Sequence, residues 1–198
     1  MSGGDLQTGG VLGSGLEVRR EGDGGVRLSG RFPYRTETVL SDAGGREVRE
    51  LIEPGAFSDA TRDGAEVHFL AAHSFDKPLA STRSGTLTLR DTPDALEFEA
   101  RITPAILRAT YAGDAIAAAE AGLTTGLSPG FRLPSDRASG ETWETAPDGA
   151  RVRRIKRAML AELSLVTRPA YADARVDVTR HKEAPDAGLR RALRRWRA

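Results

Sequence analysis

Two stretches with a two-residue alternation decide the fold class: Gly85-Thr-Leu-Thr-Leu-Arg90 and Leu96-Glu-Phe-Glu-Ala-Arg-Ile102. In both, apolar and polar side chains alternate, as they do on the two faces of a half-buried β-strand. The segment between them, Asp91-Thr-Pro-Asp94, is rich in turn-forming residues. The pair predicts a β-hairpin and indicates a mainly β protein.

Strand character recurs on both sides of this hairpin. We expect further strands within residues 16–33, 46–52, 66–72, 123–133 and 151–167, and a loop or ragged hairpin over 134–149. Pro104 and the alanine-rich stretch after it predict a helix over residues 104–121. A C-terminal helix is expected over 187–197. Several strands with two peripheral helices predict a mainly β barrel or sandwich in one domain.

The composition narrows the chemistry. The chain has 198 residues, no cysteine and three histidines, His68, His73 and His181. It therefore has no thiol nucleophile, no disulfide framework and no Cys-based metal site, and three histidines disfavour an all-His metal site. No apolar run approaches the about 20 residues that cross a bilayer, and the start lacks the pattern of a signal peptide. We expect no metal, no membrane contact and a cytoplasmic setting.

Charge is distributed unevenly along the chain. Residues 151–198 carry 14 Lys and Arg against 5 Asp and Glu, whereas residues 1–150 carry 15 against 23. We divide the chain into a flexible Gly-rich leader (1–15), a single domain (16–179) and a basic helical tail (180–198). The tail reads either as a solvated helix or as an interaction segment. Nucleic-acid binding is disfavoured because Trp196 is its one aromatic residue.

Nucleophilic catalysis without cysteine requires Ser, Thr or Lys with a base. His73 follows an apolar strand, where a loop can present it to a substrate, whereas His68 lies among apolar neighbours and is interpreted as a packed or edge histidine. Ser128 is the candidate nucleophile, with Gly126 and Gly130 two residues away on either side. Small flanking residues let a substrate backbone approach closely. The alternative for Ser128 is an ordinary turn serine.

A carboxylate lies inside the apolar segment Ala161-Glu-Leu-Ser-Leu-Val-Thr167. Glu162 and Ser164 share one face of this expected strand, and Leu163 and Leu165 share the other. Burying an unpaired carboxylate is costly, so Glu162 needs a partner such as His or Arg. The alternative is a surface Glu on an edge strand.

In combination and order, these segments resemble the prohead (capsid maturation) protease family of tailed bacteriophages, which shares its fold with the herpesvirus assemblins. The resemblance covers residues 26–178. It rests on four segments: Glu53-Pro-Gly-Ala-Phe57, His73 with Lys77-Pro-Leu79, Gly126-Leu-Ser-Pro-Gly-Phe131, and Glu162-Leu-Ser-Leu-Val-Thr-Arg-Pro-Ala-Tyr171. The resemblance implies an assemblin-like β-barrel.

The resemblance also implies roles for individual residues. Ser128 corresponds to the nucleophile, His73 to its general base and Glu162 to the third member of the triad, where herpesvirus relatives use a second His. Arg168 lies in a stretch comparable to the Arg-bearing loop that stabilises the oxyanion, and Gly130 is a candidate oxyanion or substrate-contact position. No metal and no organic cofactor is implied.

The sequence departs from the family pattern around these positions. Ala72 replaces the usual Asn before the histidine, Ser74 replaces Asp after it, and Ala80 replaces Gly. Pro129 replaces an aromatic residue and has no N–H, so an oxyanion hole cannot use the amide that follows Ser128.

The implied function is a serine endopeptidase that acts inside the procapsid, in the cytoplasm of an infected bacterium or prophage host. Its expected substrates are scaffold and major capsid protein precursors, and autocleavage is also expected. Herpesvirus relatives are activated by dimerisation, which makes a homodimer an expectation here. The alternative function is a catalytically inactive capsid-assembly or scaffold factor of the same fold. A second alternative is nucleic-acid binding through the basic tail.

Overall fold

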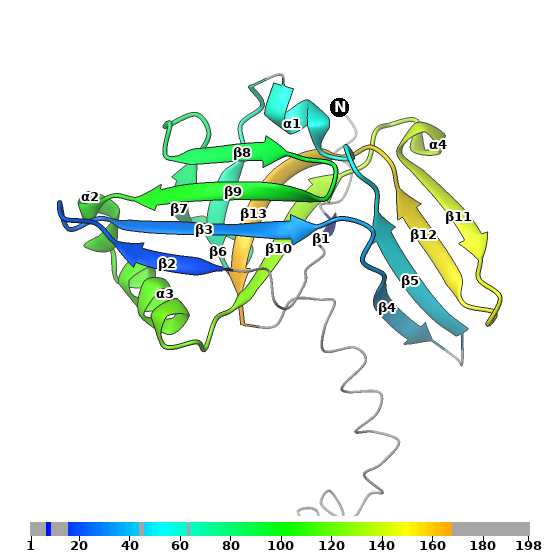
Figure 1. Ribbon diagram of the computed structural model, residues 1–198, viewed down its shortest axis with the longest axis horizontal. Coiled ribbons are helices and arrows are strands. Elements are labelled where there is room, and N and C mark those ends of the chain that lie inside the picture. The colour runs from blue at the N-terminus through cyan, green and yellow to red at the C-terminus, as the bar shows by residue number, and fades with distance from the viewer. Residues whose placement is uncertain (1–6, 9–15, 44–45, 63, 168–198) are drawn as a thin grey trace, which may run out of the picture.

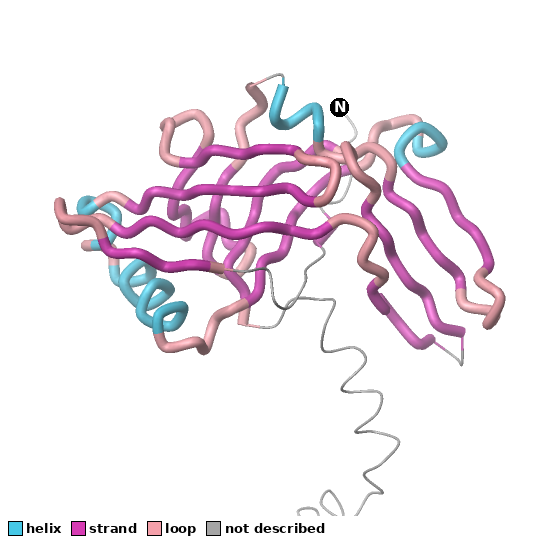
Figure 2. Tube along the Cα trace, in the orientation of Figure 1, coloured by secondary structure: helices cyan, strands magenta, loops and turns pink. Residues whose placement is uncertain are grey.

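The structure is a computed structural model that describes residues 7–8, 16–43, 46–62 and 64–167. Its strands form one five-stranded and two four-stranded sheets (Figure 1). Short helices lie at the periphery of these sheets (Figure 2). They are α1 (Ser58–Arg62), α2 (Pro104–Leu107), α3 (Thr110–Glu120) and α4 (Arg137–Gly140). The expected mainly β class with peripheral helices is confirmed.

The five-stranded sheet contains the segments that carry the candidate site. Its spatial order is β1 (Gln7–Thr8), β10 (Gly126–Arg132), β13 (Met159–Val166), β6 (His68–Ala71) and β7 (Ser74–Ser81). Strand β13 pairs antiparallel with β10 and parallel with β6. The candidate serine and carboxylate strands are therefore neighbours, and the strand that leads to His73 lies on the other side of β13.

A second sheet packs over the first. Its order is β2 (Glu17–Arg20), β3 (Val26–Pro33), β9 (Ala95–Ile102) and β8 (Leu87–Asp91). Strands β8 and β9 form the antiparallel hairpin predicted from the sequence. Figure 1 shows β3 and β9 crossing in front of β10 and β13.

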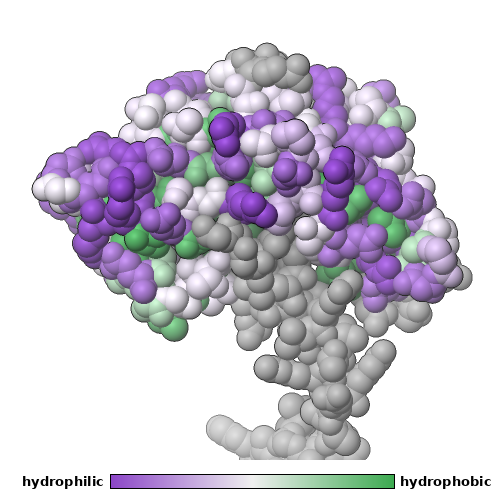
Figure 3. All heavy atoms as spheres, viewed as in Figure 1, coloured by the Kyte–Doolittle hydropathy of each residue, from purple (hydrophilic) through white to green (hydrophobic). Residues whose placement is uncertain are grey.

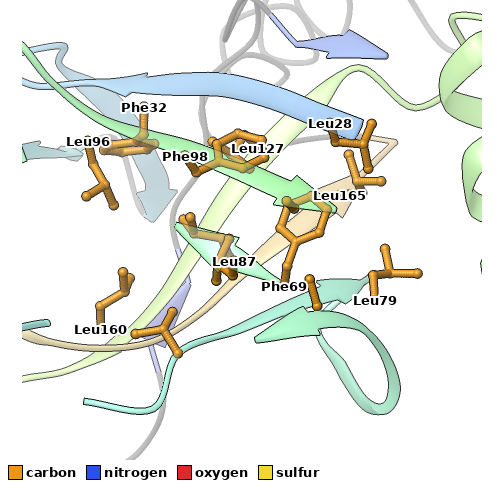
Figure 4. Packing of buried hydrophobic residues seen from close by; sticks show 14 of the residues in the cluster. Leu28, Phe32, Phe69, Leu79, Leu87, Leu96, Phe98, Leu127, Leu160 and Leu165 are labelled. Carbon is orange, nitrogen blue, oxygen red and sulfur yellow. The ribbon is translucent and has the colours of Figure 1, made fainter. Parts of the chain in front are cut away.

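The hydrophobic core fills the space between these two sheets. Phe69 of β6 stacks on Phe98 of β9, with ring centroids 5.1 Å apart. Leu28, Leu127 and Leu165 point into the same cluster (Figure 4). Apolar side chains from alternate positions of both sheets thus meet in one core, as in a sandwich.

The third sheet extends from one end of the molecule (Figure 1). Its order is β11 (Glu141–Thr145), β12 (Arg151–Ile155), β5 (Arg46–Ile52) and β4 (Thr38–Ala43). Within the described parts of the chain the strands pair as three separate sheets, and no closed barrel is found among them. The barrel implied by the resemblance is thus not seen in the strand pairing.

Local details go beyond the expectations. Residues 74–81 form β7, a strand that was not predicted, and β11 pairs antiparallel with β12, in agreement with the hairpin alternative for residues 134–149. Both are edge strands, which tolerate Pro78 and polar residues because one edge needs no partner. The strand character expected within 151–167 is confirmed as two strands in different sheets, because the chain turns at residues 156–158, where Ala158 N–H donates to Ala56 C=O at 2.8 Å.

The helix expected over residues 104–121 is interrupted. Ala109 adopts an extended conformation (φ −74°, ψ 128°), which ends the α2 region and starts α3. The change of direction lets Ala112 and Ile116 of α3 reach the core, and the Tyr111 hydroxyl donates to the carbonyl of Pro78. Tertiary packing here outweighs the helix propensity of the alanine-rich stretch.

The remaining predictions lie outside the described residues or concern the surface. The basic tail with its expected helix, Arg168 and His181 fall in ranges that the structure does not describe, and of the leader only Gln7–Thr8 is described, as β1 paired with β10. In the described ranges, no helix has the length and apolar character to span a membrane. The face of the molecule seen in Figure 3 is mostly hydrophilic, with separate small hydrophobic areas.

Candidate active site

Strand β13 carries polar side chains on one face and apolar side chains on the other. Leu163 and Leu165 belong to the hydrophobic core cluster, so the alternation of the strand turns Glu162 and Ser164 to the opposite face. Both polar residues are nevertheless fully buried, at 0% exposure. The prediction that Glu162 and Ser164 share a face is confirmed, and the surface-Glu alternative is wrong.

The register of β10 on β13 sets Ser128 on this polar face. Ser128 pairs directly with Ser164, and Gly130 pairs with Glu162. Directly opposed residues of antiparallel strands have Cα atoms about 4.5–5.5 Å apart and side chains on the same face. Ser128 is itself buried, at 1% exposure. The candidate serine thus lies one strand away from the candidate carboxylate, on the same side of the sheet.

His73 lies in the tight turn that joins β6 to β7. Ala71 pairs with Ser74, so Ala72 and His73 alone form the loop, and both have positive φ (53° and 58°). Positive φ at both central positions is the property of a type I′ hairpin turn. Ala72 N–H donates to the Leu165 carbonyl at 2.9 Å, which holds the turn against the end of β13.

The turn brings the imidazole of His73 onto the carboxylate of Glu162. His73 Nδ1 lies 2.8 Å from Glu162 Oε1, and the Ser164 hydroxyl donates to Oε2 at 2.6 Å. That short distance is typical of an O–H donor to a charged carboxylate. An ionised carboxylate can only accept, so a hydrogen bond to ionised Glu162 requires the proton on His73 Nδ1. The imidazole is 29% exposed, with Nδ1 directed at the carboxylate.

Gly130 has a role that the sequence did not reveal. A Cβ built at this position would lie 2.0 Å from Glu162 Oε1 and 2.7 Å from the carboxyl carbon. The carboxylate therefore occupies the space directly over the glycine. Only glycine leaves room for Glu162 in the orientation that contacts His73.

The other candidate positions differ in outcome. Pro129 lies in β10, and Arg168 is outside the described residues, so the structure does not test its role in oxyanion stabilisation. His68 of β6 is the register partner of Glu162 on β13. Its imidazole packs edge-on to Phe75, and its Nε2 lies 3.6 Å from Glu66 Oε1. These contacts, and a side chain that is 30% exposed, agree with the interpretation of His68 as a packed or edge histidine.

A surface pocket of about 370 Å³ adjoins the His73 turn. Ala72, Lys77, Tyr111, Asp114 and Leu165 contribute to its walls.

Across the described ranges, no cluster of three or more His, Asp or Glu side chains could hold a metal ion.

Ala72 is strained in the turn, which gives the first prediction. Left-handed backbone costs an alanine about 1 kcal/mol, whereas Asn adopts it more readily. We expect Ala72→Asn to stabilise the fold by about 1 kcal/mol and to raise Tm by about 2–4 °C. Thermal unfolding followed by circular dichroism measures the shift. The control Ala117→Asn, on the exposed side of α3, should lower Tm instead; a lower Tm for Ala72→Asn would contradict the strain.

These residue types in this arrangement are those that serine proteases use to activate a hydroxyl. The model of the Caudovirus prohead serine protease family matches residues 16–186, which is most of the chain. The chain therefore belongs to this family of phage prohead serine proteases, whose members act in capsid maturation. No curated protein and no solved structure gives a significant match.

Proposed function

We propose that this protein is an active serine endopeptidase in which Ser128, His73 and Glu162 form the catalytic triad. The observation that carries the proposal is the 2.8 Å contact between His73 Nδ1 and the buried Glu162, on the face of the sheet to which Ser128 belongs. A buried carboxylate that orients one imidazole nitrogen leaves the other free to accept a proton. That is the task of the general base in acyl transfer.

The reaction proceeds in two halves. Nε2 of His73 takes the proton of the Ser128 hydroxyl while Oγ bonds to the peptide carbonyl carbon, and the C–N bond then breaks as the imidazolium returns this proton to the amine. A water molecule next attacks the acyl-enzyme, giving one proton to His73, which passes it to Ser128 Oγ as the ester breaks. Glu162 stabilises the imidazolium in both halves.

The residue that follows Ser128 cannot donate a hydrogen bond to the oxyanion, because Pro129 has no N–H. Another group must therefore be the donor. We assign this task to Arg168, in the segment that follows β13. A guanidinium donates hydrogen bonds and carries a full positive charge, so it can replace backbone amides in this role.

The substrates follow from the family. We propose that the enzyme cleaves the scaffold segment or precursor of the major capsid protein inside the procapsid, in the infected bacterium, and that it also cleaves itself. The pocket beside the His73 turn is the candidate site for a substrate side chain. Activation by homodimerisation is a part of this proposal that rests on the resemblance.

A serine-directed fluorophosphonate tests the proposal without knowledge of the cleavage site. Ser128 Oγ would bond to phosphorus, fluoride would leave, and His73 would take the hydroxyl proton. We expect the wild-type chain to gain the mass of one phosphonyl group on Ser128, and Ser128→Ala to gain none. Equal labelling of both chains, or labelling of another serine, would overturn the proposal.

Two observations favour the alternative of an inactive capsid-assembly factor with the same fold. Pro129 removes one amide donor, and Ser128 is 1% exposed, so a peptide can reach it only after the surrounding segments move. This alternative predicts a folded chain that assembles with its capsid partner and does not react with the fluorophosphonate.

A further inference from the structure

A single buried hydroxyl links the parts of the candidate site. Ser164 is fully buried, donates to Glu162 Oε2 at 2.6 Å and accepts from the backbone N–H of His73 at 3.0 Å. It is also the direct cross-strand partner of Ser128. Ser164 therefore contacts the carboxylate and the histidine turn, and lies opposite the serine strand.

The direction of these hydrogen bonds is determined by chemistry. A backbone amide can only donate, so the Ser164 oxygen must accept from His73. A serine hydroxyl has one proton, and the ionised carboxylate of Glu162 can only accept, so that proton goes to Oε2. The His73 amide thus donates to the Ser164 hydroxyl, and the Ser164 hydroxyl donates to Glu162.

These two hydrogen bonds hold the orientation of the Glu162 carboxylate and the backbone conformation of His73. With Oε2 bound to Ser164, the carboxylate cannot rotate, and Oε1 stays directed at His73 Nδ1. With its amide bound to Ser164, the turn keeps the His73 backbone in its left-handed conformation, at φ 58°. Both members of the His73–Glu162 pair are thus positioned by the same oxygen atom.

We propose that Ser164 is a positioning residue of the active site, which sets the mutual orientation of His73 and Glu162. The inference rests on the proposed function of Ser128, His73 and Glu162. Ser164 is fully buried and acts only through its two neighbours. It should therefore affect the rate of the chemical step and leave the affinity for a reagent unchanged.

The test uses an isosteric pair at this position, Ser164→Thr and Ser164→Val, in the full-length chain. Threonine and valine add the same extra bulk, and only threonine keeps the hydroxyl, so the pair separates hydrogen bonding from packing. The fluorophosphonate labelling rate is measured against reagent concentration, which yields the maximal rate and the half-saturating concentration separately. Circular dichroism melting identifies variants that do not fold.

We expect Ser164→Thr to react within about threefold of the wild-type maximal rate. Ser164→Val should be slower by about 10- to 100-fold, as for the loss of one hydrogen bond to a charged group, at an unchanged half-saturating concentration. If Ser164→Val gives no cooperative melt, Ser164→Ala, which adds no volume, takes its place in the comparison.

The possible failures are distinguishable. Equal maximal rates for the Thr and Val (or Ala) variants, whether fast or slow, would overturn the role of Ser164 and leave the triad intact. A loss in Ser164→Val that lies wholly in the half-saturating concentration would do the same. A wild-type chain that fails to react at Ser128 would overturn the proposed function, and the inference with it.

Discussion

Glu162→Gln should lower the rate of peptide cleavage, or of fluorophosphonate labelling, by about 10⁴-fold, the size of the loss when the triad carboxylate of another serine protease becomes an amide. An amide carries no charge to stabilise the imidazolium. Its NH₂ group can also donate to His73 Nδ1, which moves the ring proton to Nε2 and removes the base. The rate is read by mass spectrometry of the intact chain, at equal protein concentrations.

The fold should survive this substitution, because an amide is less costly to bury than a carboxylate. Glu97→Gln is the matched control: its carboxylate forms an exposed ion pair with Arg90 on the opposite sheet. We expect wild-type labelling from Glu97→Gln. A Glu162→Gln chain that reacts at more than a tenth of the wild-type rate would show that Glu162 is no part of the catalytic machinery.

Gly130→Ala should lower the labelling rate by a comparable factor, about 10³-fold or more, although it only adds a methyl group. The new Cβ would lie 2.0 Å from Glu162 Oε1, and the carboxylate is the far end of a flexible side chain. The side chain will therefore rotate away, and the 2.8 Å contact with His73 will be lost. The labelling rate and a thermal melt together separate lost alignment from lost folding.

Gly113→Ala is the control for this glycine. Its Cβ would lie 3.6 Å from the carbonyl oxygen of Leu107, an ordinary van der Waals contact, so the methyl group fits in α3. We expect unchanged labelling and a gain of about 0.5–1 kcal/mol in stability from helix propensity. The double variant Gly130→Ala with Glu162→Gln should be no slower than Glu162→Gln alone, because both remove the same contact. Additive losses would contradict the shared cause.

The sequence was sufficient to predict the mainly β class of the fold, the family, and the shared face of Glu162 and Ser164. Alternation in the β8–β9 hairpin and in β13 is a direct consequence of burying one face, so Leu163 and Glu162 could be assigned to opposite faces. Apolar periodicity gave no such information for β4, β7 and β11, which are edge strands of their sheets. Their polar residues face water as readily in a strand as in a loop.

The geometry of the site could not be predicted because it depends on register. The contact of Gly130 with Glu162, and that of Ser164 with His73, exist because β10 and the β6–β7 turn meet β13 at particular residues. A shift of one residue would direct every side chain of β10 to the other face. The left-handed conformation of Ala72 is equally hidden, since alanine does not signal positive φ.

The central claim is that Ser128, activated by His73, cleaves peptide bonds. The most direct test follows the intact mass of the wild-type chain and of Ser128→Ala over time, each alone and mixed with the phage's scaffold or capsid precursor. We expect fragments of the precursor, and of the protease itself, with wild type only. Unchanged masses in both mixtures, with a folded chain and the correct precursor, would contradict it and favour the inactive assembly factor.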